Sequence, residues 1–132
     1  MRNIANYQTQ HLESANNAEI VVLLFEKAVT RLGSAQGHMH KNERLLWLAE
    51  LGKVRAIIVE LMCALDHECA PELTANLHRT YSWMLTQLSE VGRSGKPEAV
   101  EPLLRICHTL LDAFRTAVFT DGEADEPAEA AS

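Results

Sequence analysis

Histidine and cysteine are the side chains of this sequence whose chemistry could bind a metal ion. Cys63 and His67 lie four residues apart, which would place both on one face of a helix at a spacing suitable for two metal ligands. A protein metal site needs at least one more ligand. The remaining histidines are scattered over different segments, at His11, His38, His40, His78 and His108. The sequence therefore predicts no metal site and no cofactor.

A phosphorylated histidine would be a second kind of chemistry. Phosphotransfer domains are four-helix bundles with an exposed histidine in mid-helix and a lysine three residues later. His38 has this spacing to Lys41, but it follows Gly37 and precedes Asn42, so we expect it at a helix end or in a loop. His78 is expected in mid-helix but lacks the lysine. A histidine phosphotransfer bundle stays as an alternative function.

Enzyme motifs give no further candidates. "GRSGKP" has too few residues between its glycines for a phosphate loop, and Pro97 stands where Ser or Thr would bind magnesium. No GxSxG, HExxH or ExxH pattern is present on the expected helices. We predict that the protein is not an enzyme.

Apolar residues recur at spacings of three and four along four segments, which predicts four amphipathic helices. The first is expected to begin at Asn16 as N-cap. The repeating positions are Ala28, Leu32 and Ala35; Trp47, Leu51, Val54, Ile58, Leu61 and Leu65; Leu73, Leu77, Tyr81, Met84, Leu88 and Val91; and Val100, Leu104, Cys107, Leu111, Phe114 and Val118. Short connections near 37–43, 66–71 and 92–97 force antiparallel neighbours. The predicted fold is all-α, an antiparallel up-down-up-down four-helix bundle over residues 16–119.

Charge and composition limit the partners. Five acidic residues and no basic one lie in 120–132, which we expect to be a disordered acidic tail. Without them the chain has 13 acidic against 12 basic side chains and no clustered basic stripe, so nucleic acid is not an expected partner. The chain has no signal-peptide core and no apolar run long enough for membrane insertion. Three cysteines, Cys63, Cys69 and Cys107, lack CxxC spacing and are interpreted as reduced core thiols of a cytoplasmic protein.

The run from Ile20 to Phe25 is apolar on every side of the expected helix. One explanation is a helix wedged between two neighbours. The other is a helix with two functions, in which Ile20 and Leu24, with Leu23, face the core while an outer groove binds a partner segment. The candidate groove residues are Val21, Val22, Phe25, Val29, Tyr81 and Trp83.

Several short motifs, taken in order, resemble the FliS family of flagellin export chaperones from about Ile4 to Phe119. "IANYQ", followed by Ser14 and Ala15, is similar to the family's amino-terminal segment, and "AEIVVLLFEKAV" is similar to the start of its first helix. "LMCALD" resembles the segment after the second helix. "ANLHRTYSWML" and "LLDAFRTAV" resemble its Tyr-Met and Asp-Ala segments.

The resemblance implies a cytoplasmic chaperone that binds the C-terminal segment of flagellin and prevents its polymerisation. It also implies delivery of that client to the flagellar type III export gate, with a regulatory protein as a further possible partner. Residues 1–15 would then cover the groove when no client is bound, through Ile4 and Tyr7. Beside the phosphotransfer bundle, a self-associating helical protein without a client is the remaining alternative.

Overall fold

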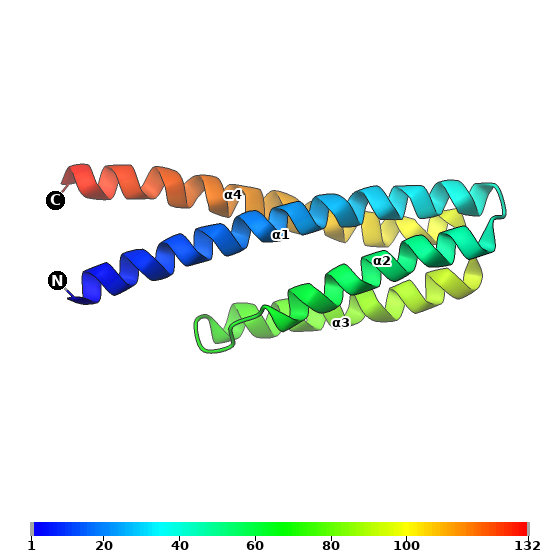
Figure 1. Cartoon of the computed structure of the whole chain (residues 1–132), viewed down its shortest axis with the longest axis horizontal. Coiled ribbons are helices and arrows are strands. Elements are labelled where there is room, and N and C mark those ends of the chain that lie inside the picture. Colours follow the sequence, from blue (N-terminus) through cyan, green and yellow to red (C-terminus); the bar gives the residue numbers. More distant parts are fainter. Residues whose placement is uncertain (1, 132) are drawn as a thin grey trace.

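The computed structural model consists of four α-helices and one short 3-10 helix (Figure 1). It describes the backbone of residues 2–131 and the side chains of residues 18–117. The elements are α1 (Arg2–His40), α2 (Arg44–Cys63), α3 (Pro71–Ser94), η1 (Pro97–Val100) and α4 (Glu101–Ala131). The described backbone contains no β-strand. The all-α prediction is confirmed.

Successive helices run in opposite directions, as the short connections predicted. Figure 1 shows both chain termini at one end of the bundle, while the α1–α2 and α3–α4 connections lie at the other end. Helix α1 packs along α2 and α4, and α2 packs along α3. The central position of α1 between two neighbours explains why much of its surface is apolar.

Local sequence determines where the helices begin and end, but the predicted start of α1 was wrong. Helix α1 begins at Arg2, so Asn16 lies inside it and is not its N-cap. The reason is that no Gly or Pro lies between Arg2 and Asn16 to interrupt a helix.

The predicted divisions at 1–15 and 120–132 fall outside the residues whose side chains the structure describes. Pro71 starts α3, and Gly95 ends it in the left-handed conformation with φ of 64°.

The core is filled by one stripe from each helix. The predicted stripe of α2 is confirmed for its buried residues Trp47, Leu51, Val54, Ile58 and Leu61, whereas Leu65 lies beyond the end of the helix and is half-buried. On α3, Thr74 is buried in place of Leu73, which is exposed. The Thr74 hydroxyl donates a hydrogen bond of 3.1 Å to the Asp66 carbonyl oxygen, so the preceding loop supplies its polar partner.

The cysteines differ in their surroundings. Cys107 is fully buried, as predicted, whereas Cys63 and Cys69 are exposed. The prediction of three core thiols was wrong for these two because α2 ends at Cys63 and Cys69 belongs to the connection before α3. Positions at the end of a bundle lack neighbours that could cover them.

Burial of Tyr81 and Cys107 should make the fold sensitive to alkaline pH. Burial raises the pKa of Tyr81 to about 12, with a smaller contribution from Cys107, and burial raises the pKa of the Cys107 thiol to about 12. Both groups ionise more easily in the unfolded chain. Their stabilisation is therefore complete below the ordinary values of 9.0 and 10.0 and is lost as the pH rises toward 12.

We expect the urea midpoint to fall progressively above pH 9. Cys107→Ala should show a smaller fall between pH 9 and 11 than the parent protein, because it has no thiol to ionise. Parallel pH profiles for the two proteins would contradict a contribution from Cys107.

Candidate functional site

The described side chains that could bind a metal ion do not form a site. Among the described residues, no group of three or more His, Cys, Asp or Glu is placed to hold a metal ion. Cys63 ends α2, so His67 lies beyond the helix and the expected shared helix face does not exist. His38 lies in the last turn of α1, as expected, with its Nδ1 3.0 Å from Glu43 Oε1.

The notable feature of the described surface is its exposed apolar side chains. Large apolar residues with more than a third of their surface exposed are Ile20, Leu23, Leu45, Leu46, Leu48, Val59, Leu73 and Trp83. Single exposed apolar residues are ordinary, but here two lie on α1, four on α2 and two on α3, one of them a tryptophan. These exposed apolar side chains, rather than any cluster of reactive groups, are the candidate site.

On α1, Phe25 was predicted to be exposed and is buried, whereas Ile20 and Leu23 were predicted to be buried and are exposed. Phe25 is fully buried, with its ring centroid 6.2 Å from that of Tyr81 and 6.1 Å from that of Phe114. Ile20 and Leu23, expected in the core, are 53% and 59% exposed. The prediction that Phe25 and Tyr81 line an outer groove was therefore wrong, because both belong to the aromatic centre of the core.

The remaining predicted groove residues lie at the edge of the core or outside it. Val21, Val22 and Val29 are half-buried and pack against the core from one side. Trp83 on α3 is 42% exposed, which suits a residue that contacts a partner. Contact with a client stays a prediction for these four.

A second apolar face on α2 was missed by the sequence analysis. Its exposed residues recur at spacings of four and three, and they are Leu45, Ala49, Gly52, Ala56, Val59 and Cys63. None of them is charged, although they face solvent on a surface helix. The signal was present in the sequence as a second heptad-like repeat beside the buried one, but small residues make it weak.

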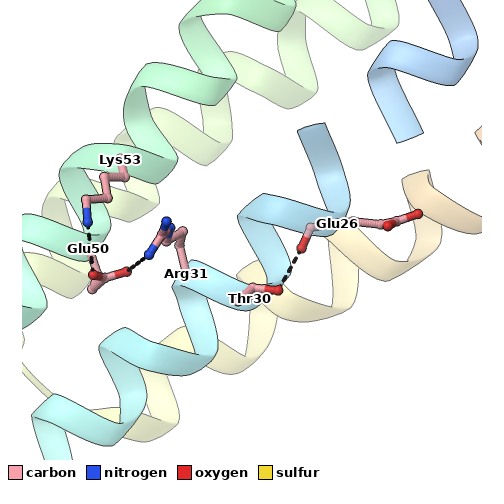
Figure 2. Close-up of polar contacts among 5 residues, drawn as sticks. All are labelled: Glu26, Thr30, Arg31, Glu50 and Lys53. Atoms are coloured by element: carbon pink, nitrogen blue, oxygen red, sulfur yellow. Dashed lines mark hydrogen bonds and ion pairs between the residues drawn. The ribbon is translucent and has the colours of Figure 1, made fainter. Parts of the chain in front are cut away.

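Ion pairs connect α1 to both of its neighbouring helices, α2 and α4. Figure 2 shows Glu50 of α2 between Arg31 of α1 and Lys53, with N to O distances of 3.5 and 3.4 Å. On the other flank the Glu26 carboxylate accepts a hydrogen bond of 3.2 Å from Arg115 of α4. Exposed pairs of this kind stabilise by less than ~1 kcal/mol each. Their contribution to the stability of the bundle is therefore small.

Comparison with known proteins assigns the family. The family model described as "Flagellar protein FliS" matches residues 1–121. The flagellar secretion chaperone FliS of Escherichia coli strain K12 is 28% identical over 115 residues, covering 86% of this chain and 85% of the relative. The chaperone FliSB of Pseudomonas aeruginosa is 33% identical over 98 residues, covering 71% and 78%. FliS of Vibrio cholerae serotype O1 is 24% identical over 103 residues, covering 78% and 76%.

The fold and the surface agree with this assignment. The family is one of chaperones rather than enzymes, which fits a surface of apolar side chains. Within the described residues, no helix is long and apolar enough to span a membrane. A filled four-helix core with uncovered apolar residues on three helices, together with a family match over most of its length, makes this chain a member of the FliS family of flagellar secretion chaperones.

Proposed function

We propose that this protein is a cytoplasmic chaperone that binds the C-terminal segment of flagellin. It prevents premature polymerisation of that client and delivers it to the flagellar type III export apparatus. The observation that carries the proposal is the set of exposed apolar side chains outside a core that is already filled. The names of the relatives, which are flagellar secretion chaperones, support the same function for this chain.

The surface suits a client segment that carries an apolar face. The apolar face of such a segment exposes area that drives aggregation, and burying it against Ile20, Leu23 and Trp83 removes that area from water. The client loses conformational entropy on binding, so a large interface remains compatible with release at the export apparatus.

The proposed contact residues follow from exposure. Ile20 and Leu23 take the central role on α1, with the half-buried Val21, Val22 and Val29 at their edge, and Trp83 is a separate exposed contact on α3. Ile4 and Tyr7, predicted as a cover for the groove, lie outside the residues whose side chains the structure describes. A tethered cover would lower the apparent affinity by the fraction of time for which it occupies the surface.

Co-elution and calorimetry with the flagellin C-terminal segment of the same organism test the proposal. We expect a one-to-one complex with sub-micromolar affinity and a negative heat-capacity change. The double variant Ile20→Asp, Leu23→Asp should bind at least tenfold more weakly with little change in Tm, because both side chains are exposed in the free protein.

Lys27→Asp is the matched control, since Lys27 is an exposed residue on the same helix and gains the same side chain. It should bind within about threefold of the parent protein, as expected for one exposed charge. Absence of any complex at tens of micromolar would contradict the proposal and direct attention to phosphorylation of the exposed His78.

A further inference from the structure

A shallow pocket of about 320 Å³ lies between α2 and α3, near the end of the bundle that is opposite the two termini (Figure 1). Its apolar lining includes Leu51 and Leu88. No Asp or Glu belongs to the lining, although the whole chain carries a net charge of -6. The polar side chains that define this arginine pocket are Arg44, Arg55, Ser89 and Arg93.

Arg55 is held in a fixed position within the arginine pocket. Its Nη2 donates hydrogen bonds to the Leu85 carbonyl oxygen at 3.1 Å and to Ser89 Oγ at 2.6 Å. The residue is half-buried, and among the described residues it forms no ion pair with a carboxylate. Its Nη1 and Nε have no hydrogen-bond partner in that part of the chain. A guanidinium that is fixed at one nitrogen and has donors left at the other two suits an anion.

Ser89 can donate a hydrogen bond to the same anion. Its Oγ accepts the hydrogen bond from Arg55, and its own hydroxyl donates to the Leu85 carbonyl oxygen at 3.4 Å. Hydrogen bonds between a hydroxyl and a carbonyl oxygen are usually ~2.7–2.8 Å long, so this one is weak. An oxyanion in the pocket would give the hydroxyl a stronger acceptor.

Arg44 and Arg93 supply further donors from both helices. Arg93 follows Ser89 by four residues, so the two lie on one face of α3. Arg93 pairs with Glu90, but both side chains are largely exposed, and exposed pairs are weak. An anion in the pocket can therefore replace Glu90 as the partner of Arg93. Arg44, at the start of α2, forms no ion pair with a carboxylate within residues 18–117.

We propose that the arginine pocket binds the phosphate group of a small molecule. The oxygens of a phosphate accept hydrogen bonds in several directions at once, which matches guanidinium groups on two helices together with a hydroxyl. The volume of about 320 Å³ lies within the range of small-ligand sites, ~300–1,000 Å³. Leu51 and Leu88 lie in the same lining, so an uncharged part of the ligand has an apolar surface to contact.

This inference goes beyond the proposed function, because its ligand is a small anion and not a polypeptide. Its test needs no client, so failure of flagellin binding would leave it standing. The alternative is a group of solvated arginines, which would attract every anion through its charge and would show no saturation.

An NMR titration of the full-length, isotope-labelled protein tests the site, with NaCl added to keep the ionic strength constant. Pyrophosphate should shift the backbone amide signals of Gly52 and Gly92, which line the pocket. The shifts should saturate with a Kd of about 1 mM or lower. Acetate and chloride at the same ionic strength should give no saturable shift, because neither matches the set of donors.

Inorganic phosphate and ADP distinguish the two sources of the phosphate group. A Kd for ADP at least ~10-fold lower than that for pyrophosphate would identify a nucleotide whose uncharged part contacts the leucines. Equal Kd values, with saturable binding of inorganic phosphate, would identify the phosphate group alone as the ligand. Both outcomes support the site.

Substitution of the arginines tests their role. Arg55→Gln should raise the Kd for pyrophosphate ~10-fold or more. Because Arg55 also joins α2 to α3, Arg44→Gln, Arg93→Gln provides a second test at exposed residues, with a similar loss of affinity and a Tm within a few degrees of the parent. Arg79→Gln, Arg105→Gln is the matched control, since it removes the same charge at exposed residues outside the pocket. Its Kd should stay within about twofold.

Three results would overturn the inference. Shifts that rise without saturation, or that chloride reproduces, would show solvated arginines only. Saturable binding that both pocket variants retain within about twofold would place the anion elsewhere on the protein. Acetate binding as tight as that of phosphate would show that the pocket does not select a phosphate group.

Discussion

Replacing Phe25 by aspartate is expected to abolish the folded state. The side chain is fully buried between Tyr81 and Phe114, and truncation of such an aromatic to alanine costs about 3–5 kcal/mol. Aspartate adds the cost of burying a charge that has no partner in this apolar centre. Since the total stability of a domain of this size is about 5–15 kcal/mol, the sum removes most or all of it.

Circular dichroism melting measures this effect directly. Phe25→Asp should lose the cooperative transition, and its failure to bind a client would then say nothing about the binding surface. Leu23→Asp, two residues earlier, provides the comparison because its side chain is 59% exposed. It should keep the Tm of the parent protein within a few degrees. A folded Phe25→Asp with a normal Tm would show that the aromatic side chain lies on the surface after all.

The fold was largely predictable because helix periodicity is a strong signal over long segments. The α2 stripe from Trp47 to Leu61 repeats over several turns, and a single face accounts for it. The connections were predictable for a similar reason, since Pro71 and Gly95 are residues that start and end helices. The start of α1 was missed because Asn16 is a good N-cap residue in a segment that is also compatible with helix.

The two sides of α1 could not be assigned from the sequence. In a run of six apolar residues every position fits a core, so periodicity inside Ile20–Phe25 carries no information. The assignment depends on the residues that follow, because Phe25, Ala28, Leu32, Ala35 and Met39 form one stripe at spacings of three and four. Extending that stripe backwards, instead of choosing Ile20 and Leu24, would have placed Phe25 in the core.

The exposed face of α2 shows a different limit. Small residues such as Ala49, Gly52 and Ala56 pack well in cores and are also tolerated in solvent, so their type does not tell which side they occupy. Only the placement of the larger stripe on the opposite side of α2 reveals that they are uncovered. Exposed apolar faces built from small residues are therefore harder to recognise from sequence than those that contain large aromatic side chains.

Replacing Gly95 by alanine is expected to have the second largest effect on stability. Gly95 has φ of 64°, which costs an L-residue about 1–2 kcal/mol. An added Cβ would also lie 2.6 Å from Trp47 Cζ2 and 2.8 Å from Cη2. The indole cannot easily move away, because its Nε1 donates a hydrogen bond of 3.1 Å to the Gly92 carbonyl oxygen in a buried position. Overpacking adds about 1–3 kcal/mol, giving roughly 3 kcal/mol in all.

Chemical denaturation of four variants, Gly95→Ala, Trp47→Phe, their double variant and Gly37→Ala, separates the two causes. Gly37→Ala is the control for the change of residue type: its Cβ meets nothing within 4 Å in helix α1, so it should stabilise by about 0.5–1 kcal/mol, with the opposite sign. In a Trp47→Phe background the smaller ring relieves the contact, and Gly95→Ala should then cost only the conformational part. A double-mutant cycle should give a coupling of about 2 kcal/mol. Equal costs in both backgrounds would show that φ alone fixes glycine at this position, and that the contact with Trp47 does not.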